Sequence, residues 1–304
     1  MTKPVIIDCD PGIDDAVAIL LALASNGLEV KLITTCAGNL PSEKITLNAL
    51  KLLSFVGAHH IEVARGATKP LLKELVVAEE VHGTFGLGGA ELGEPVLSLS
   101  ERSALEAMRD VIMHSEQKVS IVAIGPLTNI ALLVKSYPEV LPHIEQLSIM
   151  GGSCLGGNCT PVAEFNIYVD PLAAQIVFHA GIPITMFGLN VTHQVPVLRD
   201  DIERIRNIGN RTGEAVATML DFYAKEDRVD GLHDPCAVAY LIDPSLFATK
   251  WCNVEVETKG EFTEGQTVVD ADNRTNRPKN ANVAFEVKRD KLIDMVYEAI
   301  KKFN

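Results

Sequence analysis

The sequence is poor in tryptophan and has no excess of positive charge, and both absences exclude classes of protein. Its 304 residues include 27 Lys and Arg against 40 Asp and Glu, a net charge of −13, and its only tryptophan is Trp251. Because nucleic-acid backbones are bound by clustered basic side chains, we expect no nucleic-acid polymer as a partner. The sequence also lacks an apolar run of about 18 residues, the length that indicates a membrane-spanning helix, so we expect no membrane partner.

Cysteine is sparse as well. The six cysteines lie mostly in apolar or glycine-rich stretches, and the close pair Cys154 and Cys159 has no second pair to complete a zinc site. The chain starts with the letters MTKP and passes directly into a predicted strand, without the pattern of a signal peptide. We therefore expect a reduced, cytoplasmic protein.

Several common catalytic motifs are also missing. The sequence has no G-x-G-x-x-G, no G-x-x-x-x-G-K-[ST], no G-x-S-x-G and no H-E-x-x-H. These absences argue against a dinucleotide site, a phosphate-binding loop, an esterase of the nucleophile-elbow type and a zinc protease. The chemistry of the protein must depend on another set of residues.

An acidic segment near the N-terminus is the strongest signal in the sequence. Residues 8–15 read DCDPGIDD, after the apolar run 5–7 and before the helix-forming run 16–24. This order predicts a strand, a sharp turn at Pro11 and Gly12, and then a helix.

The crowding of four carboxylates in this segment predicts a cation. Alternation along the strand places Asp8 and Asp10 on the same side of its carboxyl end. Asp14 and Asp15 fall in the first helical turn, where the helix dipole favours anions. No Lys or Arg lies between residues 3 and 31 to balance them, so Ca²⁺ or Mg²⁺ with oxygen ligands fits best. The alternative is two helix-capping acids beside two solvated ones.

Strand and helix signals alternate along the chain, which predicts an α/β fold. We expect one domain over residues 1–304, with a mostly parallel, Rossmann-like sheet and helices on both faces. Strands are predicted at 30–36, 61–64, 119–123, 146–150, 183–188, near 251–258, 266–270 and 281–287, and a final helix at 290–303. Because several of these strands end in Gly, Asn or Thr turns at one rim of the sheet, we expect the site there.

Three further segments contain candidate functional groups. Residues 65–102 form a long glycine-rich stretch with His82, either a lid or a surface insertion. His233 and Asp234 open a predicted helix, as catalytic and ligand groups or as a surface histidine and a cap. Residues 164–166 and the preceding Asn158 can bind hydroxyl groups or simply form turns.

Residues 8–15 resemble the N-terminal signature of the inosine–uridine-preferring nucleoside hydrolases. Similar segments follow at 34–39 (TTCAGN), 81–83 (VHG), 125–129 (GPLTN), 150–152 (MGG), 163–167 (AEFNI), 170–171 (DP), 191–194 (VTHQ) and 233–235 (HDP). The resemblance is strongest to the broad-specificity bacterial ribonucleoside hydrolases. It implies the nucleoside hydrolase fold, a homodimer or homotetramer, and hydrolysis of the N-glycosidic bond of purine and pyrimidine ribonucleosides to free base and ribose.

The resemblance also implies roles for individual residues. One Ca²⁺ per subunit would be bound by Asp10, Asp15, Asp234 and the carbonyl of Thr128, with Asp8 as a supporting residue. Asp10 would activate a Ca²⁺-bound water, and His233 would assist departure of the base. Substrate would be bound by Asp14, Asn39 and Asn166 at the ribose 2′- and 3′-hydroxyls, by Asn158, Glu164 and the Met150 backbone at the 5′-hydroxyl, and by His82 near the base.

The sequence departs from the family pattern at a few positions. Leu47 stands where many members carry Arg, Asn190 where Asp is usual, and Thr84 with Phe85 where Glu and Ser are frequent. With one tryptophan, the chain does not resemble the purine-specific subgroup that stacks the base on tryptophans. Base preference is therefore the property that the departures affect most.

Two alternative functions come from different classes. A haloacid-dehalogenase-type phosphatase also begins with an Asp-x-Asp after its first strand, with Asp8 as nucleophile and Mg²⁺ as cation. That group expects Thr or Val where this chain has Gly12. A non-catalytic protein that binds Ca²⁺ and nucleosides would keep the fold without turnover, although the presence of both Asp10 and His233 argues against it.

Overall fold

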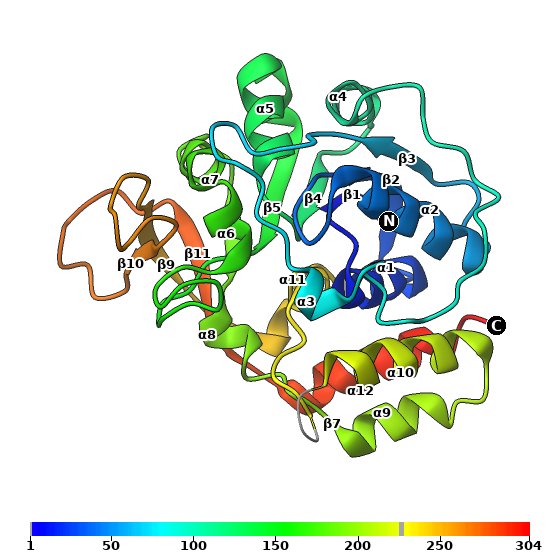
Figure 1. Ribbon diagram of the computed structural model, residues 1–304. Helices are drawn as coiled ribbons and strands as arrows, with labels where there is room; N and C mark the ends of the chain where they lie inside the picture. Colours follow the sequence, from blue (N-terminus) through cyan, green and yellow to red (C-terminus); the bar gives the residue numbers. More distant parts are fainter. Residues whose placement is uncertain (1, 225–227) are drawn as a thin grey trace.

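Short apolar runs rich in Val and Ile form the sheet at the centre of the molecule. The computed structural model describes residues 2–224 and 228–304, and within them the sheet has nine strands (Figure 1). The strands are β1 (Lys3–Cys9), β2 (Leu28–Thr35), β3 (Glu62–Arg65), β4 (Val119–Ala123), β5 (Ile144–Met150), β6 (Ile184–Phe187), β9 (Phe247–Val256), β10 (Thr267–Asp270) and β11 (Ala281–Val287). The predicted bounds of β4 and β11 are confirmed to the residue.

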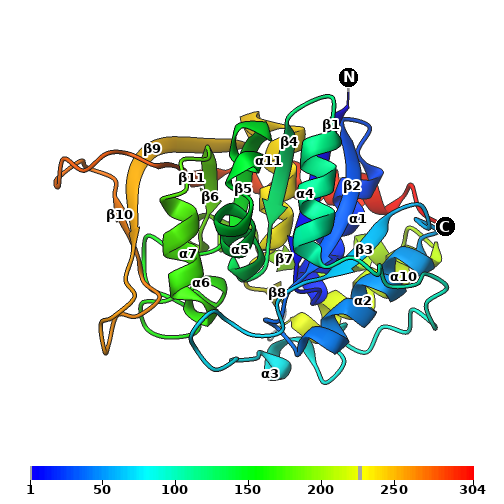
Figure 2. The same cartoon turned by 90° about the horizontal axis from the view of Figure 1, so that it is seen from above.

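The strand order is β10-β9-β11-β6-β5-β4-β1-β2-β3. Neighbouring strands from β11 to β3 are parallel, whereas β9 pairs antiparallel with both β11 and β10. The mostly parallel sheet of the sequence prediction is therefore confirmed. The antiparallel strands β9 and β10 lie at one end of the sheet and β3 at the other (Figure 2). Strand β9 begins at Phe247, earlier than the predicted start near residue 251. The prediction missed this first half because it is mostly exposed and lacks an apolar pattern.

Helices cover both faces of the sheet, as the sequence predicted (Figure 1). One face carries α1 (Ile13–Ala24), α2 (Ser42–Phe55), α11 (Asp234–Ile242) and α12 (Arg289–Ile300), with α9 (Arg199–Arg206) and α10 (Arg211–Tyr223) outside them. The other face carries α4 (Ala104–His114), α5 (Thr128–Ser136) and α7 (Pro171–Phe178). Along β1, Val5 and Ile7 pack into the first layer and Ile6 into the second. Each such side chain, when fully buried, contributes roughly 1.5–3 kcal/mol.

The connection order reverses beside β1, which has β2 on one side and β4 on the other. In open α/β sheets, ligands bind beyond the carboxyl ends of the strands at such a reversal. The residues that follow β1, β2, β4 and β5 therefore meet at one rim.

Short elements surround this rim. They are α3 (Glu79–His82), α6 (Phe165–Val169), α8 (Leu189–Thr192) and the two-residue strands β7 (Val197–Leu198) and β8 (Arg228–Val229), while 3₁₀ turns lie elsewhere at Pro138–His143 and Pro244–Leu246. The pairing of β7 with β8 was not predicted.

All six cysteines have free thiols. No helix in the described residues is long and apolar enough to cross a membrane.

Candidate active site

The turn between β1 and α1 is closed by one of its own aspartates. Gly12 is the N-terminal cap of α1. The carboxylate of Asp15 accepts hydrogen bonds from the backbone N–H groups of Asp10 (3.1 Å) and Gly12 (2.9 Å). The Gly12 N–H is a donor that a helix start leaves without a partner, and the Asp10 N–H lies in the turn before it, so Asp15 stabilises both the helix start and the turn.

Asp10 is fully buried directly after β1, with one oxygen bound and one available. Its Oδ2 accepts from the backbone N–H of Asn39 (2.7 Å), whereas Oδ1 has no partner among the described residues. A Cβ on Gly38 would lie 2.1 Å from Oδ2, and one on Gly125 would lie 2.7 Å from Oδ1. The two glycines therefore make room for the carboxylate, and Oδ1 can face a ligand.

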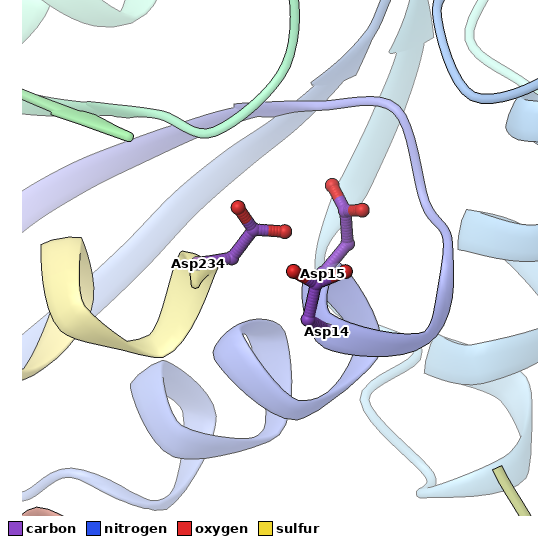
Figure 3. Close-up of side chains that lie close together, drawn as sticks. All are labelled: Asp14, Asp15 and Asp234. Carbon is purple, nitrogen blue, oxygen red and sulfur yellow. The ribbon is translucent and has the colours of Figure 1, made fainter. Parts of the chain in front are cut away.

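Three more carboxylates converge beside this turn. Asp14 and Asp15 extend from the first turn of α1, and Asp234 extends from the first residue of α11 (Figure 3). One oxygen of each lies within 4.8 Å of the others. The N-termini of two helices thus hold three acids around a common space.

Burial changes the protonation of these acids. It raises the pKa of Asp14 to about 7 and that of Asp15 to about 6. Burial and the neighbouring carboxylates raise the pKa of Asp10 and of Asp234 well above the usual range. All four can be ionised together only beside a compensating positive charge.

The donor set fits a hard divalent cation. It consists of buried carboxylate oxygens, one of them without a partner, and oxygen ligands are those that Ca²⁺ and Mg²⁺ prefer. Among the described residues, no Lys or Arg lines the adjoining cavity. Thr128 is buried at the start of α5, directly beyond β4, and its hydroxyl donates to Asp170 (2.8 Å). These residues could bind a metal ion.

Asp8 lies in β1, behind the other acids. Its Oδ1 accepts from the Thr34 hydroxyl (2.6 Å) and the Asn129 side-chain amide (2.8 Å), while Oδ2 has no partner among the described residues. Burial raises the pKa of Asp8 to about 7. Since Thr34 belongs to β2 and Asn129 to α5, Asp8 connects the elements under the site and does not line the cavity.

A cavity of about 320 Å³ opens at this rim, within the size range of small-molecule sites. Asp10, Asp15 and Thr128 are buried behind its wall. The structure brings together all the substrate-binding residues that the sequence analysis named. The cavity is lined by Asp14, Asn39, His82, Met150, Asn158, Glu164 and Asn166, and also by His233 and Asp234.

Glu164 and Asn166 are held rigidly at the ends of β4 and β5. Glu164 caps α6 and accepts from the backbone N–H groups of Asn166 (3.0 Å) and Gly152 (2.9 Å). Burial raises its pKa to about 7. The Asn166 amide donates to the carbonyls of Ile124 (3.0 Å) and Met150 (3.2 Å). Asn158 is fixed separately, because its Oδ1 accepts from the Phe165 N–H (2.9 Å).

His82 is buried in the cavity wall on α3, not in a surface loop. Its Nδ1 accepts from the backbone N–H of Ile13 (3.3 Å), and burial lowers its pKa to about 4. The ring lies 5.6 Å from that of Tyr223, measured between centroids. Residues 76–78 and 80–82 line the cavity, so part of the long segment 65–102 belongs to the site.

His233 lies half-buried immediately before α11. Burial, and then the neighbouring His193 and His82, lower its pKa to about 3. Its Nδ1 lies 2.7 Å from the hydroxyl of Thr192 at the end of α8. The ring of His193 meets it edge-on, with centroids 5.5 Å apart.

The sequence analysis missed Tyr223 and His193 as cavity residues. His193 lies in the segment VTHQ, which could have marked it, whereas Tyr223 ends an amphipathic helix without a local motif.

The residues that depart from the family pattern do not line the cavity: Leu47, Thr84, Phe85 and Asn190. Asn190 instead joins two backbones, because its side chain accepts from the Cys154 N–H (3.2 Å) and donates to the Ala284 carbonyl (2.9 Å).

Comparisons with known proteins agree with this geometry. A family described as inosine–uridine preferring nucleoside hydrolase matches residues 5–294. The chain is 46% identical over 310 residues to a pyrimidine-specific ribonucleoside hydrolase of Photobacterium profundum, with 100% of both chains covered. A purine-preferring ribonucleoside hydrolase from Gardnerella vaginalis has a similar structure, with a TM-score of 0.92, 32% identity, and 99% of this chain and 98% of that chain covered. A plant nucleoside hydrolase gives a TM-score of 0.93 and 34% identity, with 99% of each chain covered.

Proposed function

The chain belongs to the inosine–uridine preferring nucleoside hydrolase family and is an N-glycosyl hydrolase of ribonucleosides, and we propose that it uses Ca²⁺ to release free base and ribose from pyrimidine ribonucleosides. The observation that carries the proposal is the unpartnered Oδ1 of Asp10 beside three converging carboxylates. Family membership excludes the phosphatase alternative.

Asp10, Asp15, Asp234 and the Thr128 carbonyl would hold the cation. Ca²⁺ suits this set because it takes six to eight oxygen ligands in flexible geometry. When bound, it would lower the pKa of the attacking water and anchor the ribose hydroxyls.

Asp10 acts as the general base in this proposal. The Asn39 N–H holds Oδ2, which leaves Oδ1 to take the proton of the water that attacks C1′. The transition state resembles an oxocarbenium ion, as in glycoside hydrolysis. The nearby carboxylate of Asp14 stabilises its positive charge.

Ribose is recognised by groups whose positions are already fixed. Asp14, Asn39 and Asn166 bind the 2′- and 3′-hydroxyls, and Asn158 and Glu164 bind the 5′-hydroxyl. A deoxyribose would leave a buried polar group without its partner, at a cost of about 1–3 kcal/mol. We therefore expect strong preference for ribonucleosides.

His233 assists departure of the base, and His82 lies beside the base. Both rings line the same cavity as the groups proposed to bind ribose. A hydrogen bond to the leaving base stabilises the negative charge that the base acquires. A hydrogen-bond donor placed at such developing charge contributes on the order of 10²–10³ in rate.

The choice of base rests on the relatives. The sequence led us to expect both purine and pyrimidine nucleosides. The relative that is 46% identical along its full length is named pyrimidine-specific, and the one at 32% identity is named purine-preferring. We give the greater weight to the first, and place uridine ahead of inosine.

One assay tests the function. Release of base and ribose is measured with uridine and inosine, before and after chelation of divalent cations and after return of Ca²⁺. We expect faster turnover of uridine, loss on chelation and recovery with Ca²⁺. Binding of uridine without turnover, by folded protein supplied with Ca²⁺, would instead identify a non-catalytic nucleoside-binding protein.

A further inference from the structure

Two histidines in the cavity wall use the same nitrogen to contact the protein. His82 accepts from the Ile13 N–H through Nδ1 (3.3 Å). A backbone N–H can only donate, so this Nδ1 has no proton. The ring proton of His82 must therefore be on Nε2.

His233 has an equivalent contact with a side chain. Its Nδ1 lies 2.7 Å from Oγ1 of Thr192, and Thr192 is fully buried. Among the described residues, the Thr192 hydroxyl has no other hydrogen-bond partner. A hydroxyl carries one proton to donate, and buried donors are almost always paired. An unprotonated Nδ1 provides the acceptor.

We propose that Thr192 is a positioning residue that fixes the tautomer of His233 by donating its hydroxyl proton to Nδ1. The ring proton is then on Nε2, the nitrogen that remains to face the cavity. The proposal rests on the proposed function, in which His233 assists departure of the base.

The local fold brings these two groups together. The Thr192 N–H donates to the Gly188 carbonyl (3.1 Å), which fixes the end of α8. A Cβ on Gly231 would lie 2.9 Å from the Thr192 carbonyl oxygen and 3.0 Å from Cε1 of His233. The absence of a side chain at Gly231 therefore permits the close approach of α8 and the segment before α11.

The tautomer matters for the leaving base. When the C1′–N bond breaks, its electron pair moves onto the base, and Nε2–H donates a hydrogen bond to the growing negative charge. The ring keeps its proton, so the base departs as an anion and takes a proton from solvent, and the proton that Asp10 removes from the attacking water is later released to solvent. In the other tautomer, the lone pair of Nε2 would face the base and repel it.

The kinetic test compares Thr192→Val with Thr192→Ser. Valine keeps the shape of threonine without its hydroxyl, and serine keeps the hydroxyl. On uridine we expect Thr192→Val to lower kcat about tenfold or more with little change in KM, and Thr192→Ser to retain most activity. On 4-nitrophenyl riboside, whose leaving group needs no assistance, the loss should be less than about threefold. Equal losses on both substrates would overturn the proposal.

Thr212→Val is the matched control. Thr212 is also buried and its hydroxyl donates to the Asn304 carbonyl (2.9 Å), but it does not line the cavity. Its removal should lower turnover of the two substrates equally, if at all. A uridine-selective loss in Thr212→Val as well would show that any lost buried hydroxyl has this effect, and would overturn the proposal.

A spectroscopic test does not depend on turnover. Nitrogen NMR of the labelled protein, with His233→Ala to assign the ring, reports which nitrogen is protonated. We expect Nε2–H in the native protein and a mixture in Thr192→Val. A native Nδ1–H tautomer would overturn the proposal even if uridine is hydrolysed, and Nε2–H would support it even if the assay of the proposed function fails.

Discussion

Two parts of the cavity are built differently. The acid floor consists of Asp10, Asp14, Asp15 and Asp234, and it lies at the end of β1 and in the first turns of α1 and α11. The histidine wall, His82, His193, His233 and Tyr223, comes mostly from segments between or at the ends of elements, including the four-residue helix α3. The floor is fixed by the sheet, whereas the wall is fixed by a few side-chain contacts.

This difference suggests how one fold serves several substrates. In the proposed function, the floor binds what all ribonucleosides share, and a change there would disturb the β1–α1 turn. In the same proposal, the wall lies beside the base, which is the variable part of the substrate, and its residues can change without moving the sheet. Relatives named pyrimidine-specific and purine-preferring both match nearly all of this chain.

The largest expected effect is at the floor. Asp10→Asn removes the proposed general base while keeping size and the contact with the Asn39 N–H, so uridine turnover should fall about 10³-fold or more with the fold intact. Rates and circular dichroism are measured beside Asp294→Asn, an exposed control. A folded Asp10→Asn enzyme with native turnover would contradict the role of Asp10 as the general base, and with it the proposed difference in function between floor and wall.

His233→Ala should give the next largest effect, and only for poor leaving groups. We expect uridine turnover to fall about 10²-fold and 4-nitrophenyl riboside turnover to change little. The ratio of kcat values for the two substrates is the measurement. If kcat falls by the same factor for both substrates, His233 has no part in departure of the base. The wall would then act on the same step as the floor, the attack of water.

Tyr223→Ala tests whether the wall sets base preference. The ring lies 5.6 Å from that of His82, and aromatic pairs contribute about 0.5–1.5 kcal/mol beyond burial. We expect the ratio of kcat/KM for uridine and inosine to change by about twofold to tenfold. Ca²⁺ affinity, measured by calorimetry, should stay the same. If Ca²⁺ affinity changes while the ratio of kcat/KM for the two nucleosides stays constant, Tyr223 supports the metal site and does not set base preference.

The last prediction concerns the free energy of unfolding and its dependence on pH, not turnover. The pKa of His82 is lowered from 6.5 to about 4 by burial, so between these values the unfolded chain binds a proton that the folded chain does not. The contribution of His82 to stability is therefore full above pH 6.5 and decreases as the pH falls toward 4, by at most about 3 kcal/mol. Urea unfolding of the native protein and of His82→Gln is measured with chelator present, and the free energy of unfolding of the native protein minus that of the variant should fall by this amount between pH 6.5 and 4. A difference that stays constant with pH would mean that folding does not shift the pKa of His82.

The fold and the acid floor could be largely predicted from the sequence. Alternating strand and helix signals predicted the parallel sheet, and the acidic segment 8–15 is contiguous. Local propensity therefore suffices to place Asp10, Asp14 and Asp15 at one strand end and one helix start. Asp234 comes from far along the chain, and Pro235 predicted only that it lies at a helix start. Its role as a cation ligand came from the resemblance of residues 233–235 to the family pattern.

The histidine wall depended on tertiary structure. Thr192 and His233 are 41 residues apart and Ile13 and His82 are 69 apart, and no local pattern encodes either contact. The sequence determined the fold, the acids and the family, because those follow from short-range preferences and adjacent residues. The tertiary structure alone decided which nitrogen of each ring contacts the protein, because that depends on packing between segments that meet only after the sheet has formed.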